Sequence, residues 1–278
     1  MRRYLKLFTA VFAFFRILSS LSKSDFSSHN TAYTSRIPEI DQSSLKPSLI
    51  NKVSVILLSG GVGKRFGAPI PKQYMDLVGL PVALHAFARL TLHPYCKEVI
   101  VVCEPEFDRL FADFYATLSV GDVRPALLFA RPSREYRHES MASGIRFVTG
   151  NFVAVHDAAR PLVDGRAFAR VCEDAEAFGA AVLANPVKAT LKRQAAMLVE
   201  STVDRANLWE AQTPQVFRTS LLLEGLGRFN GGGKAPTDDA SLVELFAKVK
   251  ITPGHSGNVK ITTPDDLVVA EALLRVLL

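Results

Sequence analysis

The 278-residue sequence has few cysteines, and their pattern excludes two classes of protein. The three cysteines are odd in number and lack the paired spacing of a metal site. A disulfide framework and a cysteine-bound metal are therefore not expected, and the thiols are interpreted as reduced core residues: Cys96, Cys103 and Cys172. No internal repeat is apparent.

The first 50 residues are poor in acidic residues and differ from the rest. The apolar run over residues 5–21 is interrupted by Lys6 and Arg16 and is too short for a stable membrane span. A nearly acid-free stretch rich in Ser and Thr follows, to about Arg36. This composition is typical of a targeting leader, with import into an organelle such as a plastid expected. A disordered leader on a cytoplasmic protein is the alternative, and in either case residues 1–50 are set apart from a folded domain at 51–278.

The basic charge of the protein does not indicate nucleic-acid binding. The net charge is +6, but residues 1–50 hold seven Lys and Arg against three Asp and Glu. The folded part is therefore close to neutral, and no nucleic-acid partner is expected.

The most informative stretch, Ser59 to Tyr74, lacks the features of the two commonest nucleotide loops. It reads SGGVGKRFGAPIPKQY and follows an apolar run. A P-loop needs Ser or Thr after its lysine, but Lys64 is followed by Arg65. A dinucleotide fingerprint needs a small residue where Phe66 stands. The stretch still combines glycines, which allow close backbone approach to a ligand, with cations suited to a triphosphate. An ordinary glycine-rich turn with solvated charges is the plainer interpretation.

Apolar strands and helical segments alternate from residue 53 onward. This alternation predicts an α/β fold, a mainly parallel sheet with helices on both faces. The expected strands are Val53–Leu58, Val99–Cys103, Ala126–Ala130, Phe152–Val155, Ala180–Ala184, Val249–Thr252 and Val259–Ile261. The expected helices are Pro81–His93, Pro105–Leu118, Glu135–Val148, Asp164–Phe178, Thr219–Phe229, Asp238–Phe246 and Pro264–Leu278.

The segment Lys188 to Val216 breaks this rhythm with extended sequence. An exposed two-stranded ribbon is expected here, and because such a ribbon is unstable alone, a partner subunit is a reasonable support for it.

Charged residues follow one of the expected strands and lie inside another. Asp157 and Arg160 follow the strand at Phe152, where a carboxylate at the carboxyl end of a strand suits Mg²⁺ and an arginine suits a phosphate. Lys260, in the sequence NVKITTPDDL, is expected inside a strand and aimed at an anion. An ordinary surface ion pair remains possible for Asp157 and Arg160, and the sequence TDDAS at Thr237 also fits a simple helix N-cap.

The order of these motifs carries more information than any one of them. SGGxGKR–PKQY, HDAARP, KATLK, DRxxLWEAQTPQ, TDDAS and NVKITTPDDL together resemble the 2-C-methyl-D-erythritol 4-phosphate cytidylyltransferase family, over about Val53 to Leu278 and closest to its plastid and chlamydia-like branch. The resemblance implies a Rossmann-like core, Mg²⁺, CTP and 2-C-methyl-D-erythritol 4-phosphate as substrates, and a homodimer formed through an arm at about 186–209. The reaction would be transfer of CMP with release of pyrophosphate, a step of non-mevalonate isoprenoid biosynthesis.

The resemblance also implies roles for individual residues. The implied catalytic residues are Arg65, Lys72 and Lys260. The implied CTP-binding residues are Ser59, Gly60, Gly61, Gly63, Ser140 and Asp157, with Asp157 also on the metal. The implied acceptor-binding residues are Arg160, Thr190, Arg205, Thr213 and Thr237.

One segment departs from the family pattern, and two alternative functions stay open. The family has a glycine turn before an Arg-x-Asp-Ser-Val run, whereas residues 132–141 read PSREYRHESM. This loop helps to read cytosine in the family, so base selectivity is the point at which the resemblance is weakest. The alternatives are a cytidylyltransferase for another polyol phosphate, such as ribitol 5-phosphate, and a catalytically silent nucleotide-binding paralogue.

Overall fold

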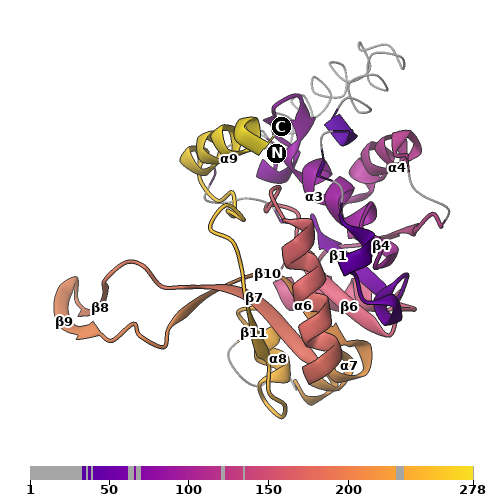
Figure 1. The fold of residues 1–278 in the computed structure, drawn as a ribbon. Helices are drawn as coiled ribbons and strands as arrows, with labels where there is room; N and C mark the ends of the chain where they lie inside the picture. The colour runs from indigo at the N-terminus through magenta and orange to yellow at the C-terminus, as the bar shows by residue number, and fades with distance from the viewer. Residues whose placement is uncertain are drawn as a thin grey trace.

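A seven-stranded sheet forms the centre of the computed structural model, which describes residues 33–277 apart from residues 36, 39, 62–65, 67–69, 120–122, 134 and 230–234. The strand order is β11-β7-β10-β6-β1-β4-β5. The strands are β1 (Val53–Leu58), β4 (Cys96–Val102), β5 (Ala126–Ala130), β6 (Phe152–Asp157), β7 (Ala180–Pro186), β10 (Trp209–Arg218) and β11 (Lys250–Pro253). Figure 1 shows this sheet with helices on both sides.

All but one of these strands run parallel, which confirms the expected mainly parallel α/β sheet. The exception is β10, which pairs antiparallel with both β6 and β7. The sequence analysis assigned residues up to Val216 to the exposed ribbon, but Gln215, Val216 and Phe217 are buried here. This part of the ribbon segment therefore belongs to the body of the sheet.

Helices cover the two faces because successive strand residues point in opposite directions. Val55 and Leu57 of β1 belong to one core cluster, and Ile56 belongs to the other. The first cluster includes residues of α3 (Val82–Thr91), α4 (Asp108–Thr117), α6 (Gly165–Phe178) and α9 (Pro264–Leu277). The second includes residues of α5 (Arg137–Ile145), α7 (Thr219–Arg228) and α8 (Ala240–Val243).

Two expected elements differ from the structure. Val259–Ile261 is not a strand, because side chains rather than a neighbouring strand hold this segment: Arg160 donates to the Asn258 carbonyl, and Asn258 donates to that of Thr213. In place of the helix expected over Asp238–Phe246, the structure has only the shorter helix α8. Its start is fixed by Gln215, whose side-chain oxygen accepts from the N–H groups of Asp239 and Ala240. A short hairpin of β2 (Asp76–Leu77) and β3 (Leu80–Pro81) was not expected.

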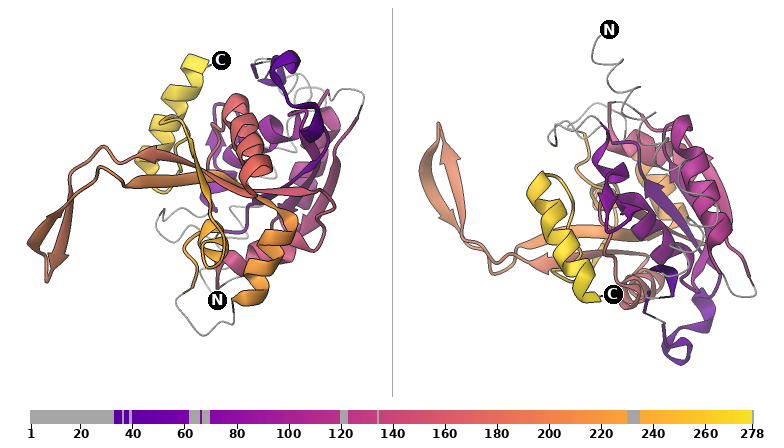
Figure 2. Two further views of the ribbon diagram at one scale, coloured as in Figure 1. Left: turned by 60° about the horizontal axis from the view of Figure 1, so that its bottom comes forward. Right: turned by 90° about the horizontal axis from the view of Figure 1, so that it is seen from above.

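The ribbon itself projects far from the sheet. Strands β8 (Leu191–Ala195) and β9 (Leu198–Val203) pair antiparallel and form a separate two-stranded sheet (Figures 1 and 2). Its tip exposes apolar side chains: Met197 is 89% and Leu198 is 73% exposed. A two-stranded hairpin of this kind is marginally stable in water unless it packs on something.

Residues just before β1 belong to the core, although the sequence analysis set residues 1–50 apart. Leu49 is fully buried, and Tyr33 and Leu45 pack in the same core cluster. The Tyr33 hydroxyl lies 2.8 Å from Nδ1 of His85 on α3. The folded part therefore begins before residue 51. Within the described residues, no helix is long and apolar enough to cross a membrane.

Candidate active site

The glycine-rich loop and Asp157 meet because their strands are neighbours in the sheet. Strand β1 pairs in parallel with β6, and Leu58 lies in register with Asp157. Strand order reverses at β1, which pairs with β4 on its other side. Ligands of open α/β sheets bind at such a reversal, beyond the carboxyl ends of the strands.

A cavity of about 340 Å³ lies at this position. It is lined by Leu58, Gly60, Gly61, Lys72, Gln73, Ser133, Glu135, Tyr136, Arg137, Ser140, Asp157, Ala159 and Lys260. Six of the residues implied by the resemblance are therefore brought together. Ser59 lies directly beneath, fully covered by the protein.

Short-range contacts hold the described part of the glycine loop in place. A Cβ atom on Gly60 would lie 2.1 Å from Cβ of Pro132, so only glycine fits there. Gln73 is buried, and its amide donates to the carbonyls of Ser59 at 2.7 Å and Gly61 at 2.9 Å. The Ser59 hydroxyl donates to the Tyr74 hydroxyl. Gln73 and Tyr74 therefore shape the loop from below, while Gly63 and Arg65 lie outside the described residues.

Asp157 is the carboxylate of the cavity wall that pairs with two cationic side chains. Its Oδ2 accepts from Nζ of Lys260 at 2.6 Å, and its Oδ1 accepts from Nη2 of Arg137 at 3.0 Å. Burial would raise the pKa of this carboxyl, but Arg137 and Lys260 outweigh burial and hold the pKa well below its usual range. Asp157 is therefore ionised at any physiological pH.

Arg137 is a site residue that the sequence analysis did not select. It stands at the first position of α5 and bridges two carboxylates, because its Nη1 donates to Oδ2 of Asp239 at 2.7 Å. Burial would lower its pKa, but the two carboxylates raise it. The available signal was its place in the Arg-x-Asp-Ser-Val run, which was considered only as a departure from the family pattern.

Arg160 and Thr213 support the cavity from outside its wall. Arg160 donates to the Asn258 carbonyl at 2.7 Å and so braces the segment that carries Lys260. The Thr213 hydroxyl is buried, accepts from the backbone N–H of Asp157 at 3.1 Å, and lies 3.1 Å from Nδ1 of His156. Both residues fix the end of β6 and its surroundings.

The segment that departs from the family pattern is closed by its own hydrogen bonds. The Ser140 hydroxyl, which lines the cavity, accepts from the Ser133 N–H at 2.9 Å. The Ser133 hydroxyl in turn donates to the carboxylate of Glu139. Hydroxyl and carboxylate contacts thus hold this turn, in place of the glycines of the family pattern.

Three implied residues lie apart from the cavity within this chain. Thr190 and Arg205 lie exposed at the base of the ribbon, where Arg205 donates to the Lys188 carbonyl. Thr237 is exposed on the loop before Asp238. None of the three lines the cavity formed by the described residues of one chain.

The described residues of the cavity supply only part of the ligand shell of a magnesium ion. Asp157 is an ionised carboxylate at the cavity wall, and the described residues contain no group of three or more acidic, His or Cys side chains that could hold a metal. Mg²⁺ usually takes one or two protein carboxylates and completes its shell with water and substrate phosphates. The site therefore fits an ion that arrives with a triphosphate better than one held by protein alone.

Comparisons with known proteins agree with this geometry. The sequence profile of the 2-C-methyl-D-erythritol 4-phosphate cytidylyltransferase (IspD) family matches residues 53–276. The chain is 47% identical over 226 residues to the chloroplastic 2-C-methyl-D-erythritol 4-phosphate cytidylyltransferase of Oryza sativa subsp. japonica, covering 80% of this chain and 74% of the relative. It is 37% identical to the enzyme of the same name from Chlamydia pneumoniae, covering 80% of this chain and 99% of the relative.

A solved structure agrees as well. The crystal structure of 2-C-methyl-D-erythritol 4-phosphate cytidylyltransferase from Thermus thermophilus is similar with a TM-score of 0.65 and 31% identity, over 81% of this chain and 99% of that one. From the profile match and these likenesses together, the chain belongs to the 2-C-methyl-D-erythritol 4-phosphate cytidylyltransferase family and is a nucleotidyltransferase.

Proposed function

We propose that this protein transfers CMP from CTP to 2-C-methyl-D-erythritol 4-phosphate in non-mevalonate isoprenoid biosynthesis. A phosphate oxygen of the acceptor attacks the α-phosphorus of CTP, and the bond from that phosphorus to the bridging oxygen of the β-phosphate breaks. Pyrophosphate leaves with that oxygen. The observation that carries the proposal is the convergence of Lys72, Lys260 and Asp157 on one cavity beneath a glycine-rich loop.

Charge stabilisation is the main task of the residues around this cavity. The acceptor phosphate is already a nucleophile, so no general base is needed, and the protein must align two anions and offset the charge that develops. Lys72 and Lys260 line the cavity with their cationic side chains. We assign Arg65 to the same task, and Gly60, Gly61 and Gly63 to the close approach of the loop backbone to the triphosphate, with Ser59 beneath.

Asp157 and Ser140 are assigned to the nucleotide. The Asp157 carboxylate is ionised and held between Arg137 and Lys260. It would hold Mg²⁺ that arrives with CTP, and the ion when bound neutralises phosphate charge. Ser140 lines the cavity near the turn at Ser133, and we assign it to the cytosine side.

The acceptor-binding residues are best explained by a homodimer. Thr190 and Arg205 lie on the projecting ribbon, away from their own cavity, and the ribbon tip exposes Met197, Leu198 and Val199. A ribbon that packs on a partner would bury these apolar side chains and bring Thr190 and Arg205 to the partner's cavity. Arg160, Thr213 and Thr237 complete the acceptor side in this proposal, the first two by supporting the cavity floor.

The leader expected within residues 1–50 is assigned to plastid targeting. The acid-poor sequence and the chloroplastic name of the rice relative support this assignment. A fluorescent protein fused behind residues 1–50 should enter plastids in plant cells, and retention in the cytosol would contradict the assignment.

Pyrophosphate release by the full chain tests the reaction. Release is expected only with CTP, Mg²⁺ and 2-C-methyl-D-erythritol 4-phosphate together. It should fall at least tenfold when ATP replaces CTP or when ribitol 5-phosphate replaces the acceptor. Equal or faster release with ribitol 5-phosphate would reassign the acceptor. Absence of release, in protein that still binds CTP, would identify a silent paralogue.

A further inference from the structure

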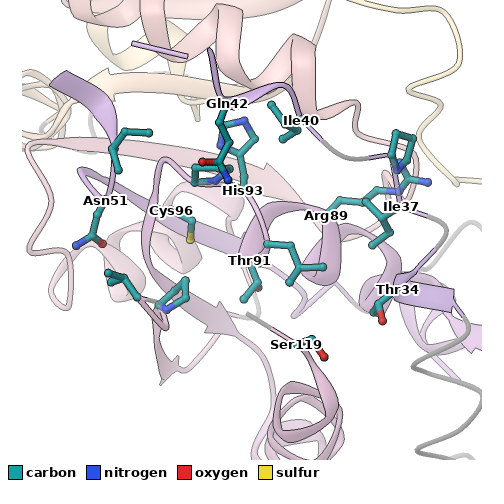
Figure 3. Close-up of a pocket in the computed structure, with 16 residues that line it drawn as sticks. Thr34, Ile37, Ile40, Gln42, Asn51, Arg89, Thr91, His93, Cys96 and Ser119 are labelled. Atoms are coloured by element: carbon teal, nitrogen blue, oxygen red, sulfur yellow. The ribbon is translucent and has the colours of Figure 1, made fainter. Parts of the chain in front are cut away.

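A second cavity lies at the opposite end of the strands from the active site. Its volume is about 590 Å³, and its lining includes Asn51 before β1, Cys96 at the start of β4 and Pro125 before β5. It thus lies at the amino ends of strands whose carboxyl ends face the active-site cavity. Among the described residues, none lines both cavities. Figure 3 shows Ile40 and Gln42 on one side of this cavity and Ser119 on the other.

Arg89 brings a buried guanidinium to this cavity, and no acidic residue among the described residues forms an ion pair with it. The residue is only 8% exposed, and its Nε and Nη2 find no hydrogen-bond acceptor among the described residues. The neighbouring Tyr33 hydroxyl does not supply a negative charge, because burial raises its pKa. No Asp or Glu is among the described residues that line the cavity. A buried guanidinium without an anion is costly, so its retention needs an explanation.

A second unpartnered polar group lies close to Arg89 in the chain. Thr91, also on α3 and 1% exposed, has a hydroxyl without a hydrogen-bond partner among the described residues. Figure 3 places both Arg89 and Thr91 at the cavity. Nε2 of His93, which also lines the cavity, is a third such group. Buried polar groups are normally hydrogen-bonded, so three such residues at one cavity indicate a missing polar occupant.

The rest of the wall combines apolar side chains with neutral polar ones. Ile37, Ile40, Ile50, Leu92 and Val123 line the cavity, and its volume lies within the range of small-molecule pockets. An occupant that satisfies both parts of the wall has an anionic head for Arg89 and an apolar body for the remaining surface.

We propose that this cavity binds a small amphipathic anion, with a carboxylate or phosphate head paired to Arg89 and hydrogen-bonded by Thr91. The head would accept the unpartnered N–H groups of the guanidinium, a contact that arginine makes well in both cases. The aliphatic body would cover the isoleucine-rich wall. This proposal is independent of the catalytic assignment, because it uses none of the residues around the active-site cavity.

The proposal requires an unusual combination of effects from Arg89→Met. Without ligand, this variant removes a buried charge that has no acidic partner among the described residues and keeps an apolar side chain of similar length, so its thermal stability should equal or exceed that of the wild type. It should at the same time lose affinity for the anion. If Arg89 instead had a structural ion pair with an acidic residue elsewhere in the chain, the same substitution would lower stability.

Calorimetric titration and thermal unfolding of the full chain test the proposal with three probes: octanoate, octyl phosphate and octan-1-ol. Octanoate or octyl phosphate should bind the wild type and raise its Tm, and whichever binds more tightly identifies the preferred head. Affinity should fall at least tenfold in Arg89→Met, and Arg89→Lys should retain part of it. Arg146→Met, which changes an exposed arginine, is the matched control and should bind like the wild type.

Three results would overturn the proposal. One is equal binding of octan-1-ol and the two anions, which would mean that only the apolar wall is used. Another is unchanged anion affinity in Arg89→Met. The third is a lower Tm of ligand-free Arg89→Met than of Arg146→Met, which would assign a structural role to Arg89.

Discussion

Nη2 of Arg137 donates to Oδ1 of Asp157 at 3.0 Å, and this pair links the cavity wall to a second buried carboxylate. The same guanidinium donates to Asp239, which is fully buried. Because a guanidinium has a planar, fixed set of donors, it holds both carboxylates in one orientation. Arg137 is therefore a positioning residue for Asp157, and it ties α5, β6 and the start of α8 together.

Removing Arg137 should be costly, and a second substitution should recover part of the cost. Arg137→Met leaves Asp239 buried without its cation, so the free energy of unfolding should fall by about 3–5 kcal/mol. Burial already raises the pKa of Asp239. Asp239→Asn in the same chain removes the unpaired charge and should restore part of the loss. Denaturant unfolding of the two single variants and the double variant measures this, and additive losses would contradict the bridge.

Lys72→Ala should separate catalysis from folding. Charge-assisted contacts are worth about 1.5–3 kcal/mol, so kcat should fall about tenfold to hundredfold while the unfolding midpoint stays near that of the wild type. Steady-state pyrophosphate release gives the rate. Lys52→Ala, at an exposed lysine before β1, is the matched control and should keep normal turnover. Near-normal turnover of Lys72→Ala would refute its assigned role.

Leu49→Ala tests whether the residues before β1 contribute to the folded core. Leu49 is fully buried, so truncation to alanine should lower the free energy of unfolding by about 2–5 kcal/mol. Leu223→Ala removes a leucine that is 49% exposed and should cost clearly less. Urea unfolding of both variants provides the comparison. Equal, small losses would mean that the core begins at β1.

Stability should fall with acid partly because of His85. Burial lowers the pKa of His85 to about 4 from the ordinary 6.5, so its stabilising contribution is complete above pH 6.5. As the pH falls from 6.5 to 4, only the unfolded chain binds the proton, and up to about 3 kcal/mol is lost. His85→Gln should therefore flatten the dependence of unfolding free energy on pH in this window. His255→Gln, at an exposed histidine, serves as the control. An unchanged slope in His85→Gln would contradict this origin.

Mixing two inactive variants tests whether residues of two chains form one active site. If Lys72 acts in one chain and Arg205 reaches it from the other, Lys72→Ala and Arg205→Ala homodimers are both impaired. A mixed dimer then has one intact site of two. After exchange of equal amounts, half of the dimers are mixed, and activity should recover to about a quarter of the wild type. Recovery absent despite proven subunit exchange would place both residues in the same chain's site.

The sequence determined the local features of this protein. The spacing of apolar residues and the local composition predicted the strands at Val53, Ala126 and Phe152 and the helix that begins after Asp164. Apolar spacing and capping residues act over a few neighbouring positions, so they can be read from the sequence. The order of the motifs was sufficient to identify the family. It also named Asp157, Lys72 and Lys260, which converge on one cavity.

Only the tertiary structure decided how distant residues pair. The antiparallel insertion of β10, the irregular path of Asn258 to Ile261, and the bridge from Arg137 to Asp157 and Asp239 all depend on contacts across large sequence separations. The two unpartnered nitrogens of Arg89, Nε and Nη2, are of the same kind, since Arg89 has the sequence setting of an ordinary residue in the last turn of a helix. Local sequence specifies backbone preference and side-chain type, but burial and charge balance arise only once the sheet has formed.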